Sequence, residues 1–239
     1  MSETDVRPPI PASLIRRPVR GGLAQPYVNV ELADGGADFR TAHTARFERC
    51  WKDCRCQSCG DRIYPRAVLM GGPLQITTGR FTEPPLCPPC ALYASRACPM
   101  VAGRMEAYAD RPRVSEGRRG EKCAEPGCDC GGWVATDPEH SADIGGTPSH
   151  AYYAAFVRPD AYVVTAHEIV TKCSDKGCEH ERLVVNGAQL KRPPLKVVLV
   201  SEPAAGRVWR TLSAAEAAEL TSRIPEHAAE VLANERNKR

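Results

Sequence analysis

Cysteines are the residues of this chain whose type and spacing most clearly support chemistry, and there are twelve of them. Two pairs have the spacing Cys-x2-Cys: CQSCG begins at Cys56 and CPPC begins at Cys87, with 27 residues between the pairs. A two-residue gap lets both thiolates of a pair bind one Zn²⁺ at about 2.3 Å, and four thiolates complete a closed tetrahedron. We therefore predict a structural zinc site with the ligands Cys56, Cys59, Cys87 and Cys90.

A second set of candidate ligands lies in a repeated motif. Residues 122–130 and 172–180 align without a gap at an offset of 50 residues, and both read Lys-Cys-x3-Gly-Cys-x-[Cys/His]. Each copy offers up to three ligands, whereas one zinc ion needs four. We favour Cys123, Cys128, Cys173 and Cys178, with Cys130 and His180 as substitutes. The alternative is a redox-active or simply buried set of thiols.

A different choice of four zinc ligands from the repeat is similar to the SWIM zinc-finger pattern. It combines Cys128-x-Cys130 with Cys178-x-His180. That resemblance implies a helix after the histidine, whereas the segment RLVVN that follows His180 favours a strand because it is rich in valine. The choice of four ligands among the six candidates therefore stays open.

The remaining cysteines and histidines have plainer interpretations. Cys98 follows Cys90 by slightly more than two helical turns and is predicted to be a small core residue. Cys50 and Cys54 are spare thiols, core residues or ligands of a further ion, and the sequence does not choose among these. Two histidines beside a polar loop are predicted to be solvated or to supply a fourth ligand, namely His140 and His150.

Catalytic zinc motifs are incomplete in this chain. A His-Asn-His nuclease needs histidines within the finger, but none lies between His43 and His140. A zinc deaminase needs His-x-Glu upstream of its cysteine pair, whereas the residue two positions after His43 is Ala45. The His-Glu pair at His167 lacks the second histidine of a metalloprotease helix, because that position is Thr171. We therefore predict a non-enzymatic protein, and an enzyme whose site is not visible in the sequence is a weaker alternative.

The elements around the first zinc site follow from turn and strand signals. RAVLM and LQITT flank a Gly-Gly-Pro turn at residues 71–73 and predict a β-hairpin between the two cysteine pairs. The segment CALYASRAC predicts a helix after the second pair. The order is a tight turn with the first cysteine pair, a hairpin, and the second cysteine pair at a helix start. This order resembles a treble-clef zinc finger over residues 55–100.

The predicted fold is α+β, with a small treble-clef-like zinc finger, a mainly antiparallel β domain that carries the second Cys/His metal site, and a C-terminal helical tail. The predicted segments are a Pro-rich extension with a short strand (1–45), the zinc finger (46–103), a charged linker (104–121), the β domain (122–210) and the C-terminal helices (211–239).

Strand and helix signals support this division. Residues 122–210 contain runs of Val, Tyr and Ile that favour strands, namely GGWVAT, HAYYAAFV, AYVVTAHEIV, RLVVN and LKVVLV. Ser213 and Glu216 form a capping-box pattern that predicts a helix start. Pro225 suits the first position of a second helix.

Composition limits the classes of function. Hydrophobic residues make up 42% of the chain and aromatic residues only 6%, so structural zinc would compensate for a modest core. No run reaches the roughly 18 apolar residues of a transmembrane helix, and the first twenty residues do not read as a signal peptide. We therefore expect a cytoplasmic protein with reduced cysteines and no membrane contact. The net charge of +3 permits nucleic-acid binding without requiring it.

Several segments together resemble a group of uncharacterised Cys-rich actinobacterial and actinophage proteins. These segments are PYVN, CQSCG, EPPLCPPCALYASRACPMVAG and PLKVVLVSEPAAGRVWR. The resemblance is strongest over residues 20–105, and some members carry a cell-envelope biogenesis label. It implies zinc binding and no established activity, so it assigns no catalytic residues.

Two main functional hypotheses follow, beside the weaker enzymatic alternative given above. The leading one is a zinc-binding protein with two structural Zn²⁺ ions that binds nucleic acid or another protein, with no small-molecule substrate. The second is a zinc-thiolate redox sensor in which surplus cysteines resolve an oxidised thiol. A base-stacking platform is a further alternative for aromatic residues otherwise assigned to the sheets, namely Trp133, Tyr152, Tyr153 and Tyr162.

Overall fold

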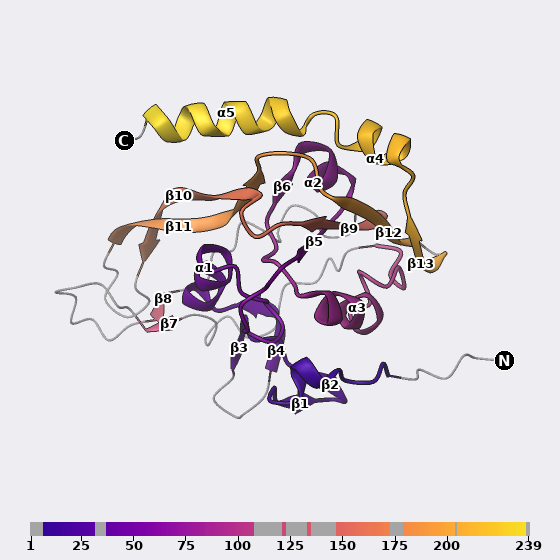
Figure 1. The fold of residues 1–239 in the computed structure, drawn as a ribbon. Coiled ribbons are helices and arrows are strands. Elements are labelled where there is room, and N and C mark those ends of the chain that lie inside the picture. The colour runs from indigo at the N-terminus through magenta and orange to yellow at the C-terminus, as the bar shows by residue number, and fades with distance from the viewer. Residues whose placement is uncertain are drawn as a thin grey trace.

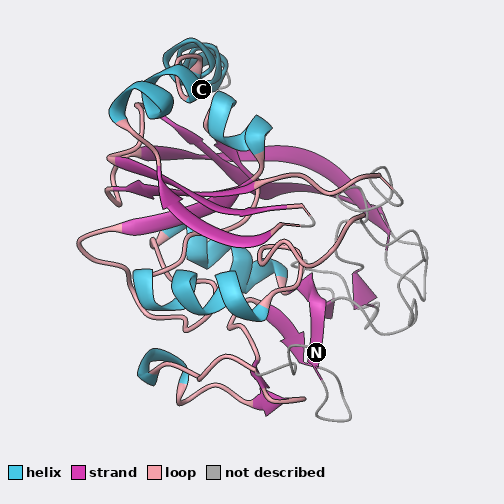
Figure 2. Ribbon diagram, turned by 90° about the vertical axis from the view of Figure 1, so that its right-hand side faces the viewer, coloured by secondary structure: helices cyan, strands magenta, loops and turns pink. Residues whose placement is uncertain are grey.

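The computed structural model describes residues 7–31, 37–107, 121–122, 133–134, 147–172, 179–203 and 205–237. Within these residues the fold is α+β, with helices and antiparallel sheets, as predicted. Figure 2 shows the longer strands in a middle layer, with helices on both sides, and short strands apart from that layer. The helices are η1 (Ala12–Leu14), α1 (Thr44–Lys52), α2 (Pro73–Thr78), α3 (Pro88–Ala97), α4 (Ala214–Leu220) and α5 (Ile224–Asn237).

The largest sheet joins segments that lie far apart in the sequence. Its order is β13-β12-β9-β5, and every neighbouring pair is antiparallel. The strands are β5 (Ala67–Gly71), β9 (Tyr152–Val157), β12 (Lys196–Glu202) and β13 (Gly206–Thr211). Because β5 is hydrogen bonded to β9, residues 46–103 and 122–210 contribute to one sheet.

A second sheet is built on a long hairpin. Strands β10 (Tyr162–Lys172) and β11 (Glu179–Leu190) pair along their length, and β6 (Arg80–Phe81) adds to the edge of β11. The strands predicted from AYVVTAHEIV and RLVVN are confirmed, and β11 extends well beyond RLVVN.

Three two-stranded sheets complete the described strands. They are β1 (Val19–Arg20) with β2 (Leu23–Ala24), β3 (Asn29–Glu31) with β4 (Ala37–Ala42), and β7 (Glu121–Lys122) with β8 (Trp133–Val134). The predicted charged linker falls almost wholly outside the described residues.

The predicted β-hairpin between the cysteine pairs is wrong. LQITT forms most of helix α2, and the flanking strands β5 and β6 pair with different partners. Pro73 occupies the first turn, where its fixed φ suits a helix, and the side chain of Gln75 accepts the Gly72 amide at 2.9 Å. These local capping interactions outweigh the strand preference of the β-branched residues.

One hydrophobic core connects the layers. Its largest buried side chains include Trp51 of α1, Leu69 of β5, Phe81 of β6 and Leu190 of β11. Figure 1 shows α4 and α5 on the opposite side of the sheets from α1 and α3. Helices from different ends of the chain therefore cover both faces of the strands.

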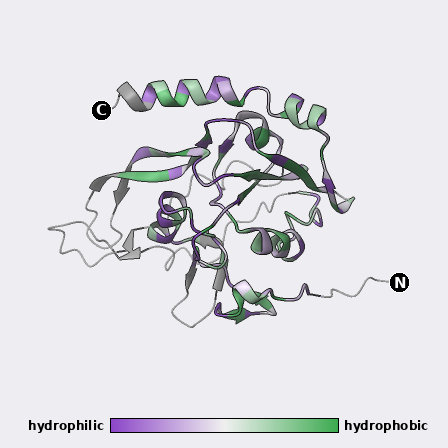
Figure 3. Ribbon diagram, in the orientation of Figure 1, coloured by the Kyte–Doolittle hydropathy of each residue, from purple (hydrophilic) through white to green (hydrophobic). Residues whose placement is uncertain are grey.

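Helix α5 is amphipathic. Figure 3 shows hydrophilic and hydrophobic residues alternating along it. Ile224 and Ala228 are buried one turn apart, so they lie on the same face of the helix. Pro225 lies in the first turn, one position later than predicted. Among the described helices, none combines the length and the hydrophobicity that a membrane-spanning helix requires.

The N-terminal segment packs on the rest of the protein. Leu14 and Ala24 are almost fully buried in the common core. The guanidinium of Arg17 donates to the carbonyls of Gln25 and Pro26, which closes the loop around β1 and β2. The prediction of a Pro-rich extension is therefore incomplete, because its apolar side chains find partners that the local pattern does not reveal.

A capping box formed by Ser213 and Glu216 stabilises the start of α4. The Ser213 amide donates to Glu216, whose own amide donates to the Ser213 hydroxyl, and Arg210 donates to the carboxylate at 3.0 Å. These hydrogen bonds, led by that of the Ser213 amide, lower the pKa of Glu216 to about 2. The ionised carboxylate therefore stabilises the fold above its ordinary pKa near 4.5, and this stabilisation is lost as the pH falls towards 2.

We expect Glu216→Gln to lower the urea midpoint at pH 7, with the difference from the unaltered chain shrinking between pH 5 and pH 2. Glu219→Gln in the same helix is the charge-matched control. A constant difference across this pH range would contradict the assignment.

Candidate metal centre

The first cysteine pair lies in a tight turn held by its own backbone. The amide of Gly60 donates to the carbonyl of Cys56 at 2.8 Å, and the amide of Cys56 donates to the carbonyl of Asp61 at 2.9 Å. Gly60 has φ +84°, and a Cβ there would lie 2.9 Å from the Tyr27 ring, so glycine suits this position on both counts. The turn brings the thiols of Cys56 and Cys59 to the same side.

The second pair lies at the start of helix α3. Cys87 is the N-cap residue and Cys90 lies in the first helical turn. Pro88 and Pro89 carry no amide hydrogen, so Cys90 is the first helical residue with an N–H group. The positive end of the helix macrodipole lies at this turn and favours negative charge on the cysteine sulfurs. Leu86 exchanges both backbone hydrogen bonds with Val68 of β5 at 2.8 Å, which fixes the second pair to the main sheet.

The structure brings the four predicted ligands together. The sulfur atoms of Cys56, Cys59, Cys87 and Cys90 all lie within 4.8 Å of one another. The Cys59 and Cys87 sulfurs are 4.0 Å apart, and all four cysteines are free thiols. A tetrahedral zinc site with Zn–S distances of about 2.3 Å has S···S edges of about 3.8 Å. The cluster is therefore close to the geometry of a four-thiolate site and can hold a metal ion.

Electrostatics in the cluster also suit a cation. The hydrogen bond with Cys59 lowers the pKa of Cys56, and the bond with Cys56 lowers the pKa of Cys87. The pKa of Cys90 is raised, first by its contact with Cys56 and then by the other two thiols. Several thiolates this close repel one another, and a bound divalent cation offsets that repulsion.

The N-terminal segment forms the surroundings of the cluster. The Ser13 hydroxyl lies 3.4 Å from the Cys90 sulfur, and the Ala24 amide donates to the Tyr93 hydroxyl of α3 at 3.0 Å. The Val28 amide donates to the carbonyl of Gln57 in the first turn at 3.0 Å. Contacts of this kind orient metal ligands. Sequence reasoning missed Ser13, since nothing in the sequence links it to a cysteine 77 positions away.

Three of the seven cysteines that the structure describes lie outside the cluster. Cys50 is fully buried, and burial raises its pKa to about 12. Burial likewise raises the pKa of Cys54, which lies beside Tyr162. Cys98 is partly buried at the C-cap of α3, and its pKa is also raised by burial. Within the described part of the chain, the four-cysteine cluster is the one group of three or more potential ligands.

Most of the second candidate site lies outside the described residues. This holds for Cys123, Cys128, Cys130, Cys173, Cys178 and His140. The backbone of His180 in β11 pairs with that of Thr171 in β10, and these two strands flank residues 173–178 in the sequence. His167 lies in β10, so the strand predicted there is confirmed. Tyr162 is buried against Trp51, and its hydroxyl donates to the Trp51 carbonyl.

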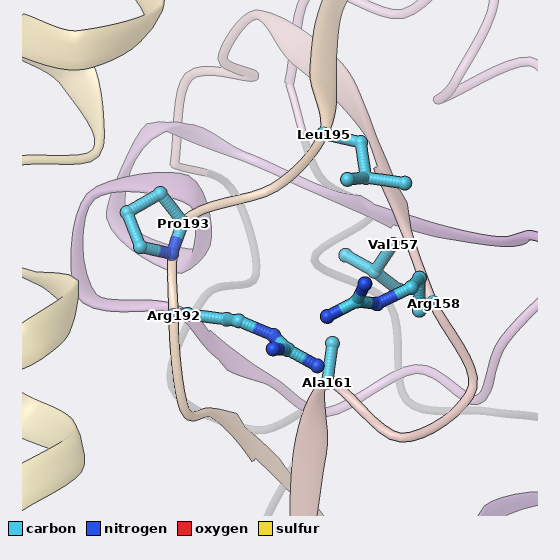
Figure 4. A pocket seen from close by; sticks show the side chains of 6 residues that line it. All are labelled: Val157, Arg158, Ala161, Arg192, Pro193 and Leu195. Atoms are coloured by element: carbon cyan, nitrogen blue, oxygen red, sulfur yellow. The ribbon is translucent and has the colours of Figure 1, made fainter.

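A small hollow lies apart from the residues of the cluster (Figure 4). Its volume is about 80 Å³, below the roughly 300–1,000 Å³ of ordinary small-molecule sites. The side chains of Arg158 and Arg192 reach into it, and both form ion pairs with Asp160 at 3.5 and 3.1 Å. The lining residues are Val157, Arg158, Ala161, Arg192, Pro193 and Leu195.

Comparisons with known proteins add no family. No protein-family model matches the chain, and neither a curated protein nor a solved structure matches it significantly. The resemblance to Cys-rich actinobacterial and actinophage proteins therefore stays a prediction.

Proposed function

We propose that this protein is a non-enzymatic binding module organised by structural zinc. The observation that carries the proposal is the convergence of four thiols from Cys56, Cys59, Cys87 and Cys90. Four cysteines at this spacing favour Zn²⁺ or an iron–sulfur cluster over hard cations. A four-thiolate zinc ion has no open coordination position, so its role would be to hold the chain rather than to bind substrate.

The position of the cluster supports this role. It joins the tight turn at Cys56 to the start of α3, and the backbone bridge between Leu86 and Val68 leads from α3 into the main sheet. The turn followed by a cysteine pair at a helix start supports a treble-clef-like finger. The structure differs from a treble clef in one respect: the intervening strands β5 and β6 belong to different sheets and do not form a hairpin.

We also propose a second zinc ion on the repeated motif and a reducing, cytoplasmic compartment. Support for the second ion comes from the repetition of Cys-x4-Cys-x-[Cys/His] at residues 123–130 and 173–180. The reducing compartment is proposed because cysteines bind zinc only as reduced thiolates.

Native mass spectrometry of the full chain, purified under reducing conditions, tests the proposal. We expect two zinc ions per chain, both removed by a strong chelator with loss of folded structure. A single zinc ion per chain would support binding at the four-cysteine cluster and would contradict the proposed second site. A chain without zinc, or one with the absorption spectrum of an iron–sulfur cluster, would contradict the proposed function.

A further inference from the structure

Three exposed residues, two basic and one aromatic, follow the zinc-binding turn in the chain. Arg62, Tyr64 and Arg66 are all exposed, and the Tyr64 side chain is 89% exposed. Ile63 is buried between Arg62 and Tyr64, so it anchors the segment while its neighbours face solvent. We name Arg62, Tyr64 and Arg66 the Arg-Tyr-Arg surface.

The segment that leads into this surface carries an excess of positive charge. Residues 44–66 contain six Lys or Arg and three Asp or Glu, and the remaining residues contain 26 of each sign. This segment therefore has a net charge of +3, and residues 7–20 are also basic, with four arginines and no acidic residue.

Ion pairs use only part of that positive charge. Lys52 pairs with Glu48, and Arg55 pairs with Asp53 at 3.3 Å. In the portion of the chain that the structure describes, the guanidinium groups of Arg62 and Arg66 have neither an ion pair nor a hydrogen bond. These two cations are therefore available to an anionic partner.

The zinc-binding turn fixes where the surface lies. Arg55 and Arg62 form an antiparallel bridge across the turn, and the Arg55 guanidinium donates to the Gly60 carbonyl at 3.1 Å. The Ile63 amide donates to the Cys54 carbonyl at 2.9 Å. Metal binding at Cys56 and Cys59 would therefore hold these residues in place.

We propose that the Arg-Tyr-Arg surface binds single-stranded nucleic acid. Bases of a single strand are free to stack on an exposed aromatic ring, and neighbouring arginines neutralise the phosphates. A duplex keeps its bases stacked inside, so it would use the arginines without the ring. The inference rests on the proposed function because the zinc ion is what positions the turn.

Fluorescence anisotropy with labelled oligo-dT and oligo-U of about 16 nucleotides tests this binding. We expect Tyr64→Ala to weaken binding about five- to 160-fold, as loss of one stacked base predicts, and Tyr64→Phe to retain it. The double variant Arg62→Gln/Arg66→Gln should reduce the slope of log K against log salt by about 1.4. The double variant Arg158→Gln/Arg192→Gln removes the same charge elsewhere and should leave the slope unchanged.

Zinc content separates failure of this inference from failure of the proposed function. Each variant is expected to hold as much zinc as the unaltered chain, measured by native mass spectrometry. A zinc-loaded chain that binds neither oligonucleotide at low salt would overturn the inference and leave a protein partner for the module. Unchanged affinity in Tyr64→Ala, or preference for duplex, would also overturn it. A chain without zinc would instead overturn the proposed function.

Discussion

Replacing Cys90 by serine is expected to remove the zinc ion of the four-cysteine cluster and to unfold the surrounding region. Cys90 is fully buried in the first turn of α3, and it contributes one of the four converging sulfurs. Structural zinc contributes about 10–16 kcal/mol to the folding of finger peptides, and a whole domain is stable by only about 5–15 kcal/mol. Loss of the ion therefore removes a large fraction of the free energy of unfolding.

The experiment combines native mass spectrometry for zinc with thermal unfolding followed by circular dichroism. We expect Cys90→Ser to bind one zinc ion fewer than the unaltered chain. We also expect it to show no cooperative unfolding transition near the melting temperature of the unaltered chain. Cys98→Ser, at the other end of the same helix and outside the cluster, is the matched control. Equal zinc content and equal stability in Cys90→Ser would contradict the ligand assignment.

The second large effect is expected at Gly187 in β11. This residue has φ +143°, and a Cβ there would lie 2.1 Å from the carbonyl oxygen of Phe81 in β6. The backbone strain costs about 1–3 kcal/mol, and forcing the strands apart adds about 1–3 kcal/mol. We therefore expect Gly187→Ala to destabilise the protein by about 2–6 kcal/mol in urea unfolding.

Gly206→Ala separates backbone strain from steric overlap. Gly206 has φ +75°, but no atom lies within 4 Å of its Cβ position. We expect this variant to lose only about 1–2 kcal/mol, the cost of a left-handed conformation for alanine. Equal losses in the two variants would show that β6 does not pack closely on β11.

The sequence predicted the elements that depend on neighbouring residues. The Cys-x2-Cys spacing predicts four cysteines whose sulfur atoms do converge, and the Ser213–Glu216 capping box marks the start of α4. Both signals are local, because a two-residue gap or a three-residue spacing determines which atoms can meet.

The long-range pairing of strands could not be predicted. Strand β5 pairs with β9 some eighty residues later, and β6 pairs with β11 more than a hundred residues later. The strand preferences of Val and Leu do not specify a partner, so the segment around α2 was assigned to a local hairpin. The Ser13 contact with Cys90 depends on the same long-range packing.

The redox hypothesis gains little from the described cysteines. A resolving thiol must form a thiolate and reach the oxidised sulfur. Burial raises the pKa of Cys50 to about 12 and also raises that of Cys98, which lowers their thiolate fraction near neutral pH. A structural role for zinc is therefore the simpler account of the cluster.

The most direct test of the zinc assignment is X-ray absorption at the zinc edge. The sample is the full chain with serine at the five cysteines of the repeated motif, namely Cys123, Cys128, Cys130, Cys173 and Cys178. We predict one zinc ion surrounded by four sulfur atoms at about 2.3 Å. A zinc shell that contains nitrogen or oxygen ligands, or a folded chain that retains no zinc, would contradict the account.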